Sequence, residues 1–194
     1  MNYLAHIYLS GDNDLLKIGN FIADGIKGKQ YVNYPDEIQK GILLHRAIDS
    51  YTDAHPIVKQ STKKLHATHG HYSGVIVDMY YDHFLAKNWS KFDSTPLPEY
   101  ATVFYKLLQE HTAMLPERIL KLMKPMITYN WLVMYESLDG IDTILKQMAH
   151  RTKFRGNLDI AIETLEAHYE ALEHEFFQFF EELQEFVQLK LQEL

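Results

Sequence analysis

The segment "LDIAIETLEAHYEALEHEFFQFFEELQEFVQLKL" (residues 158–191) decides the fold class, because its apolar residues recur at spacings of three and four. Such a stripe is typical of an amphipathic helix that packs along a bundle or a coiled-coil seam. The stripe consists of Ile162, Leu165, Tyr169, Leu172, Phe176, Phe179, Leu183 and Phe186. Phe177, Phe180 and Val187 widen the apolar face. The segment therefore predicts either a long helix across its own domain or a homodimer formed through the C-terminal helix.

The rest of the chain repeats this helical periodicity. Prolines stand near the expected helix starts, where a missing N–H costs little, and glycines fall in the breaks. Strand-like alternation between Asn-Gly or Asp-Gly turns is absent. The predicted helices span residues 12–27, 36–52, 56–67, 73–88, 97–113, 116–127, 139–150 and 158–191. The sequence thus predicts an all-α helical bundle that forms a single domain over residues 1–194.

Composition excludes several classes of protein. The 194 residues are 46% hydrophobic and include no cysteine, which rules out disulfides and thiolate chemistry and favours a reducing cytoplasm. No apolar run approaches the ~18 residues of a membrane-spanning helix, and no signal peptide is evident, so no membrane association is expected. A formal net charge of −7 argues against a nucleic-acid partner.

Polar residues interrupt the apolar pattern in four places. In "VDMYYDHFL" (residues 77–85) Asp78, Asp82 and His83 lie among large apolar side chains, and a buried charge is costly unless it is paired or holds a metal. The other three clusters are His6 in "NYLAHIYL", Asp24 in "GNFIADGIKG", and His45, Arg46, Asp49 and Asp53 in "HRAIDSYTD". By contrast, the histidines of "LHATHGH" (residues 65–71) straddle a glycine break and are expected to be exposed.

Spacing places these polar residues on common helix faces. Residues four apart lie on one face, so His45 and Asp49 point the same way, as do Asp78 and Asp82, whereas Arg46 lies beside that face. Two facing helices with such pairs can surround a divalent cation with nitrogen and oxygen ligands. Surface hydrogen bonds or a helix cap would explain each pair without a metal.

These clusters, in this order, resemble the acyl carrier protein phosphodiesterase family, a divergent branch of the HD metal-dependent phosphohydrolases. The matching segments are "MNYLAHIYLS", "IGNFIADGIKG", "GILLHRAIDSYTDAHP", "VDMYYDHFLAKNW" and "LEAHYEALEHEFFQFF". The resemblance implies an HD-like all-α domain, a divalent metal (typically Mn²⁺, with Mg²⁺, Fe²⁺ or Zn²⁺ as alternatives), and hydrolysis of holo-acyl carrier protein to apo-protein and 4′-phosphopantetheine. The adjacent pair Asp82-His83 is reversed relative to the standard His-Asp order of HD proteins.

The resemblance also implies roles for individual residues. The metal ligands would come from His6, Asp24, His45, Asp49, Asp78 and Asp82. Asp49 would orient or deprotonate a water molecule, His83 or His45 would protonate the departing serine oxygen, and Arg46 would neutralise a phosphate oxygen.

The expected partner, holo-acyl carrier protein, is acidic, as is this chain, so local basic patches would have to guide their association. The predicted partner-binding residues are Lys27, Lys29, Arg151, Lys153 and Arg155. A solvated helix end explains the last three equally well.

Two other functions remain open at this stage. The same metal site would serve an HD-type hydrolase of a nucleotide or another small phosphoester. A non-catalytic helical interaction protein would use the C-terminal stripe and hold no stoichiometric metal. A carboxylate-bridged di-iron bundle fits poorly, because the repeated Glu-x-x-His signature is missing.

Overall fold

The computed structural model describes residues 1–194, and every regular element in it is a helix. The α-helices are α1 (Tyr3–Tyr8), α2 (Asp14–Ile22), α3 (Asp36–Ala54), α4 (Pro56–His69), α5 (Ser73–Lys87), α6 (Leu97–Glu110), α7 (Glu117–Thr128), α8 (Trp131–Met134), α9 (Leu138–Arg151), α10 (Ala161–Ala167) and α11 (Tyr169–Glu193). Short 3₁₀ turns join them, including η1 (Ala23–Gly25) and η2 (Gly28–Asn33), which lie between α2 and α3. The all-α prediction is confirmed. None of the helices has both the length and the apolarity needed to cross a membrane.

Two predicted helices differ from the observed ones, and two observed helices were not predicted. The predicted helix over 158–191 is broken at His168 into α10 and α11, and the one over 12–27 leaves the α-helix at Ile22. The helices α1 and α8 have six and four residues, too few to show a 3.6-residue periodicity.

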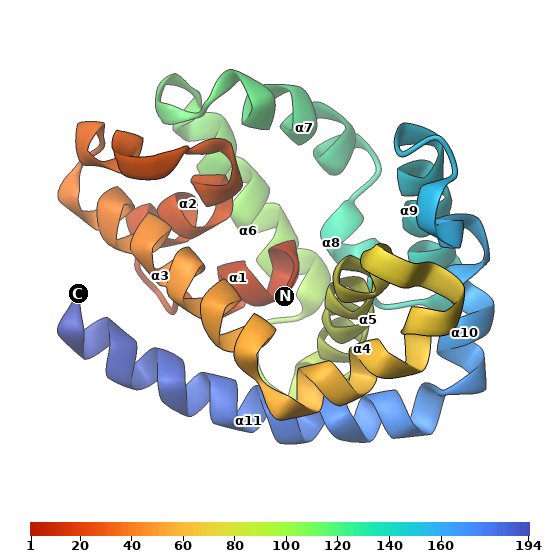
Figure 1. The fold of residues 1–194 in the computed structure, drawn as a ribbon. Coiled ribbons are helices and arrows are strands. Elements are labelled where there is room, and N and C mark those ends of the chain that lie inside the picture. Colours follow the sequence, from red (N-terminus) through yellow and green to blue (C-terminus); the bar gives the residue numbers. More distant parts are fainter.

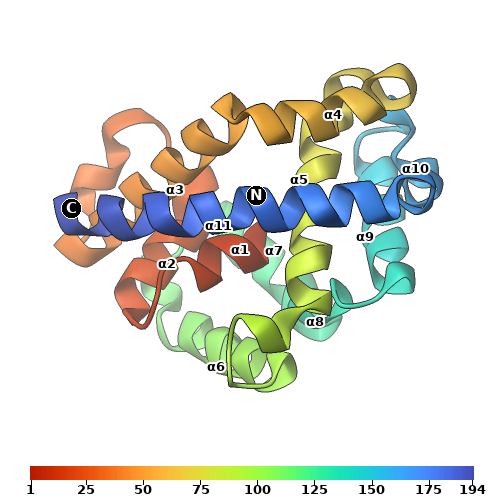
Figure 2. The same cartoon turned by 90° about the horizontal axis from the view of Figure 1, so that it is seen from below.

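The helix α11 lies across its own domain, as one of the two interpretations predicted. It runs beneath α3, α4 and α5 and contacts all three (Figures 1 and 2). Phe180 and Val187 are buried within the chain, and the Phe177 ring stacks on Phe92 with ring centroids 6.1 Å apart. The wide apolar face is therefore covered by this chain itself. Homodimerisation stays a prediction, without support from that face.

A single apolar core of 51 buried residues extends from Met1 to Val187. One histidine that the sequence analysis expected to be exposed is buried, which corrects that prediction. His69 is buried, with Nδ1 2.9 Å from the Gly156 carbonyl oxygen and Nε2 2.9 Å from Thr164 Oγ1, whereas His66 and His71 are exposed as expected. Gly156 and Thr164 lie far along the chain from His69, so these contacts cannot be predicted from local sequence.

Two glycines allow α2 and α3 to pack backbone against backbone. A Cβ atom added at Gly19 would lie 2.2 Å from the Ile38 carbonyl oxygen, and one at Gly41 would lie 2.2 Å from the Leu16 carbonyl oxygen. No larger residue fits at such a distance without moving a helix. This close packing sets the distance between Asn20 on α2 and His45 on α3.

Candidate metal centre

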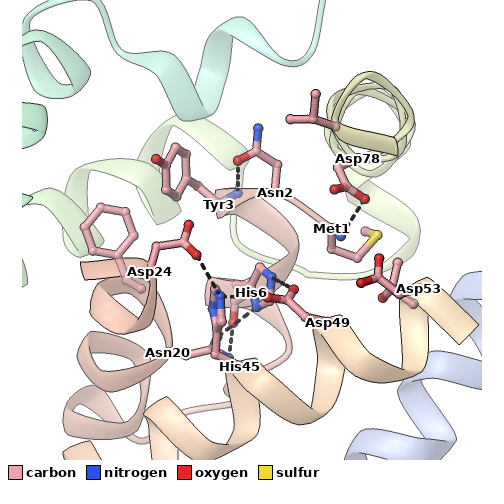
Figure 3. A pocket seen from close by; sticks show the side chains of 13 residues that line it. Met1, Asn2, Tyr3, His6, Asn20, Asp24, His45, Asp49, Asp53 and Asp78 are labelled. Carbon is pink, nitrogen blue, oxygen red and sulfur yellow. Dashed lines mark hydrogen bonds and ion pairs between the residues drawn. The ribbon is translucent and has the colours of Figure 1, made fainter. Parts of the chain in front are cut away.

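His6, His45 and Asp49 form a compact cluster where α1 and α3 meet. Their potential ligand atoms all lie within 4.8 Å of one another. His6 Nε2 lies 3.2 Å from Asp49 Oδ1, and His45 Nε2 lies 3.1 Å from Asp49 Oδ2 (Figure 3). The two imidazole rings stack with centroids 4.0 Å apart. One carboxylate thus faces two imidazole nitrogens, and the i, i+4 pairing of His45 with Asp49 is as predicted.

The side chain of Asn20 on α2 contacts both imidazoles through their Nδ1 atoms, whereas Asp49 faces their Nε2 atoms. Asn20 Nδ2 donates to the His6 carbonyl oxygen and to Ser10 Oγ, each at 2.9 Å. This fixes the orientation of the amide, so that Oδ1 faces His6 Nδ1 at 2.8 Å and His45 Nδ1 at 3.1 Å. An amide oxygen only accepts hydrogen bonds, and both Nδ1 atoms must therefore carry the proton.

This arrangement leaves the two Nε2 atoms directed at the carboxylates. His6 Nε2 is buried and has no hydrogen-bond partner, although it lies 3.2 Å from Asp49 Oδ1. Thr52 Oγ1, which lines the same cavity, is also buried and unpaired. Buried polar atoms without partners are rare, and histidines that ligate metals are normally held through the other ring nitrogen, as Asn20 holds these.

Asp24 completes the cluster from the turn η1. Its Oδ1 lies 3.4 Å from His45 Nε2, and its side chain is 56% exposed. The cavity in front of the cluster has a volume of about 270 Å³, and Asp53 and Asp78 also line it. The carboxylates therefore stand between the buried imidazoles and solvent.

The charges in this cluster are strongly coupled. Burial and the neighbouring charge of His45 lower the pKa of His6 to about 4. Burial alone would also lower the pKa of His45, but Asp24 and Asp49 raise it to about 9. Although burial opposes this, contact with the two imidazoles holds the pKa of Asp49 well below its usual range, and His45 lowers that of Asp24. Both carboxylates are thus ionised at neutral pH.

The donor set fits a divalent ion. Two imidazole nitrogens with Asp49 and Asp24 oxygens would supply mixed nitrogen and oxygen ligands, which suit Mn²⁺, Fe²⁺ or Zn²⁺. An ion would satisfy His6 Nε2 and compensate the carboxylates. Which of these residues bind a metal stays a prediction.

The structure places Asp78 and Asp82 on α5 against the N-terminal segment. Asp78 accepts a hydrogen bond from the Met1 amine at 2.8 Å. Asp82 is fully buried and accepts from the backbone N–H groups of Asn2 at 3.1 Å and Leu4 at 2.7 Å. Burial raises the pKa of Asp82 to about 7. Both carboxylates share a face, as their spacing predicts, but Asp82 caps the start of α1 and is not brought to the cluster.

His83 lies on another side of α5, away from the cluster. Its Nδ1 is 2.7 Å from the Tyr135 carbonyl oxygen, and its Nε2 is 2.7 Å from the Tyr169 hydroxyl. It lines a separate cavity that shares no residue with the one in front of the cluster. With both ring nitrogens engaged there, His83 does not reach a phosphate at the cluster, which removes the geometric basis of its predicted role as the acid.

Arg46 and the predicted docking residues lie on the surface. The Arg46 guanidinium donates to the Ile26 carbonyl oxygen at 3.1 Å and lies over the Tyr31 ring, so it does not line the cavity of the cluster. Lys27 and Lys29 are exposed, in the segment that follows Asp24. Arg151, Lys153 and Arg155 are also exposed, and the Arg151 guanidinium lies 5.5 Å from the centroid of the Trp131 ring.

Asn20 and Thr52 were missed by the sequence analysis. Asn20 is a fully buried polar residue in an otherwise apolar stretch, four positions before Asp24. Thr52 is three positions after Asp49. The i, i+3 and i, i+4 spacing that revealed His45 and Asp49 would also have drawn attention to these two uncharged residues.

The structure is that of an all-α protein with a histidine–carboxylate cluster that could hold a metal ion. Comparisons with known proteins give the family. The family model described as acyl carrier protein phosphodiesterase matches residues 1–183. The chain is 32% identical over 181 residues to a protein of Yersinia pestis named acyl carrier protein phosphodiesterase, covering 93% of this chain and 94% of that one. It is also 33% identical over 181 residues to a protein of the same name from Pectobacterium atrosepticum, covering 93% of this chain and 94% of that one. A third protein of that name, from Escherichia coli O6:H1, is 31% identical over 186 residues, covering 95% of this chain and 96% of that one.

The chain therefore belongs to the acyl carrier protein phosphodiesterase family. No solved structure matches it. The resemblance to this family is confirmed, and the HD-like character of the helical fold stays a prediction.

Replacing Asp82 with alanine is expected to lower stability without removing metal. The change leaves the buried N–H groups of Asn2 and Leu4 without an acceptor, which costs about 2–4 kcal/mol of unfolding free energy. Asp49→Ala is the matched variant, and it should lose the metal with a smaller effect on stability. Urea unfolding in chelator and metal content per folded protein separate the two. Loss of metal from Asp82→Ala at unchanged stability would contradict the capping role.

In the metal-free protein, the two clustered histidines together are expected to contribute most to stability near pH 6.5. Folding raises the pKa of His45 from 6.5 to about 9, so the stability from this group is full below 6.5 and is lost as pH rises towards 9. Folding lowers the pKa of His6 from 6.5 to about 4, so its contribution rises with pH between those values. Burial raises the pKa of Asp82 to about 7, so the contribution of Asp82 falls as pH rises towards 7 and opposes that of His6. Unfolding in chelator is therefore compared between the wild type and histidine variants that keep Asp82. Relative to the wild type, His45→Gln should lack the stability that is lost between pH 6.5 and 9, and His6→Gln should lack the rise between pH 4 and 6.5. Variants whose pH profiles match that of the wild type would refute the assignment.

Proposed function

We propose that this chain is a metal-dependent phosphodiesterase that hydrolyses holo-acyl carrier protein to apo-acyl carrier protein and 4′-phosphopantetheine. Family membership and the name shared by its relatives support the reaction class and the substrate. The proposal of a bound metal rests on one observation: Asn20 holds the two imidazoles so that their Nε2 atoms face Asp49 and Asp24.

The proposed ligands are His6, His45 and Asp49, with Asp24 as a fourth. Mn²⁺ is the preferred ion, because imidazole together with hard carboxylate oxygens suits it, and Mg²⁺, Fe²⁺ and Zn²⁺ are alternatives. When bound, such an ion polarises phosphoryl oxygens and lowers the pKa of bound water.

The residues of this chain orient the reaction around that ion. A water molecule attacks phosphorus and gives up a proton, the bond between phosphorus and the serine oxygen breaks, and that oxygen takes up one proton, so that no net proton is gained or lost. Asp49 is engaged by both imidazoles, whereas Asp53 lines the same cavity, is exposed and makes no hydrogen bond or ion pair. We therefore assign to Asp53 the role of orienting or deprotonating the attacking water.

Basic residues beside the site support an acidic carrier protein as partner, although the whole chain has a formal net charge of −7. Lys27 and Lys29 follow Asp24, and Arg118 donates to the Asp24 carbonyl oxygen at 3.4 Å. Positive charge next to the mouth of the cavity would guide the carrier to it. The absence of cysteine supports the cytoplasm as the place of action.

Incubation with holo-acyl carrier protein, with Mn²⁺ or with chelator, tests the proposal by the mass of the carrier. The expected result is conversion to the apo mass with Mn²⁺ alone. Asp49→Asn should lower turnover more than about 100-fold, since loss of a partner outside the ligand set already costs ~10–100-fold. Asp36→Asn, which changes an exposed carboxylate at the other end of α3, is the matched control and should retain full turnover.

If the carrier mass is unchanged although the protein binds metal, holo-acyl carrier protein is not the substrate, and a small phosphoester becomes the expected one. An unchanged mass with no bound metal would contradict the whole proposal.

A further inference from the structure

A second cavity adjoins the metal centre and is not used by the chemistry described above. Its volume is about 260 Å³, near the lower end, roughly 300 Å³, of small-molecule sites. It shares Asn2, Tyr3, Asp24 and Val75 with the cavity in front of the cluster. Figure 3 shows Asn2 and Tyr3 above the histidine cluster, with Asp24 beside it. We call this cavity the α8 groove; it lies next to the cavity in front of the cluster and shares part of its wall.

The α8 groove is apolar with few polar groups. Eight of its 13 lining residues are hydrophobic, among them Met79, Leu122, Trp131, Ile144 and Met148. Gln147 also lines it, and the side chains of Arg118 and Arg151 contribute positive charge. Such a lining suits a slender, mostly apolar chain that carries a few hydrogen-bonding groups.

Trp131 supplies the second observation that points to a ligand. The residue is only 5% exposed, and its buried Nε1 has no hydrogen-bond partner. The Arg151 guanidinium lies over the Trp131 ring, 5.5 Å from its centroid. A buried N–H group without an acceptor is destabilising. A carbonyl group of a ligand bound in the groove would supply the acceptor that Trp131 Nε1 lacks.

We infer that the α8 groove binds the pantetheine arm of the substrate, with Trp131 Nε1 donating to one of its amide carbonyl groups. This inference rests on the proposed function, which places the phosphodiester at the metal centre. The arm then leaves the phosphate along the shared wall of Asn2, Tyr3 and Val75. Its methyl groups and methylenes face the apolar lining, and its amide oxygens meet Trp131 Nε1 and the amide of Gln147. Arg151 holds the tryptophan ring as a positioning residue.

If the groove binds the pantetheine arm, it favours phosphodiesters that carry this arm over phosphodiesters that lack it. A substrate without an amide chain reaches the metal centre but leaves Trp131 Nε1 unpaired. Trp131→Phe keeps an aromatic ring and removes the donor. The ratio of kcat/KM for holo-acyl carrier protein to that for bis(p-nitrophenyl) phosphate should fall about tenfold, the factor that one neutral hydrogen bond contributes.

Binding of 4′-phosphopantetheine, measured by calorimetry with Mn²⁺ present, tests the inference without catalysis. Trp131→Phe should weaken binding about tenfold. Met148→Trp, which fills the groove, should weaken it further. Trp89→Phe is the matched control: Trp89 is the other of the two tryptophans, lies outside the groove, and donates its N–H to the Thr95 carbonyl oxygen at 2.8 Å. This variant should bind as the wild type does.

The two readouts separate this inference from the proposed function. If holo-acyl carrier protein is not hydrolysed but 4′-phosphopantetheine binds in a manner that depends on Trp131, the groove assignment is supported and the proposed function is wrong. If the wild type, Trp131→Phe and Met148→Trp bind 4′-phosphopantetheine equally, the groove assignment is overturned, even where hydrolysis is efficient.

Discussion

The hydrogen bonds of the Asn20 side chain are the interaction on which the site depends. Its amide nitrogen is occupied by His6 O and Ser10 Oγ, and its amide oxygen consequently faces the Nδ1 atoms of both histidines. One uncharged side chain thereby sets the tautomer and the direction of two imidazoles from different helices. The backbone packing of α2 on α3 at Gly19 and Gly41 brings this amide within reach of His45.

The helix α1 connects the buried carboxylate of Asp82 to the buried imidazoles of the cluster. Asp82 is compensated by the backbone N–H groups that begin α1, and α1 in turn carries His6 to the cluster. The capping carboxylate and the candidate ligands thus belong to two connected structures. The first builds the short helix, and the second uses one of its side chains.

Most of the fold and about half of the candidate site follow from local sequence, for a physical reason. Apolar periodicity predicted α3 to α7 and α9 to within a few residues, and helical spacing predicted that His45 and Asp49 share a face, which the 3.1 Å contact bears out. That spacing also placed Asp78 and Asp82 on one face. It gave no information on what that face packs against, which is the start of α1 rather than α3. The contacts of His6 with Asn20, and of His83 with Tyr135 and Tyr169, join residues 14, 52 and 86 positions apart. Only tertiary packing determines them.

The central claim is that His6 and His45 bind a divalent ion through Nε2 beside Asp49, and that the ion replaces the proton that His45 Nε2 carries in the metal-free protein at neutral pH. A crystal structure with Mn²⁺, in which anomalous scattering locates the ion, tests this most directly. The account predicts an ion bonded to Nε2 of His6, Nε2 of His45 and a carboxylate oxygen of Asp49, with both Nδ1 atoms still on Asn20. An ion held instead by Asp82 or His83, or an empty cluster at saturating Mn²⁺, would contradict it.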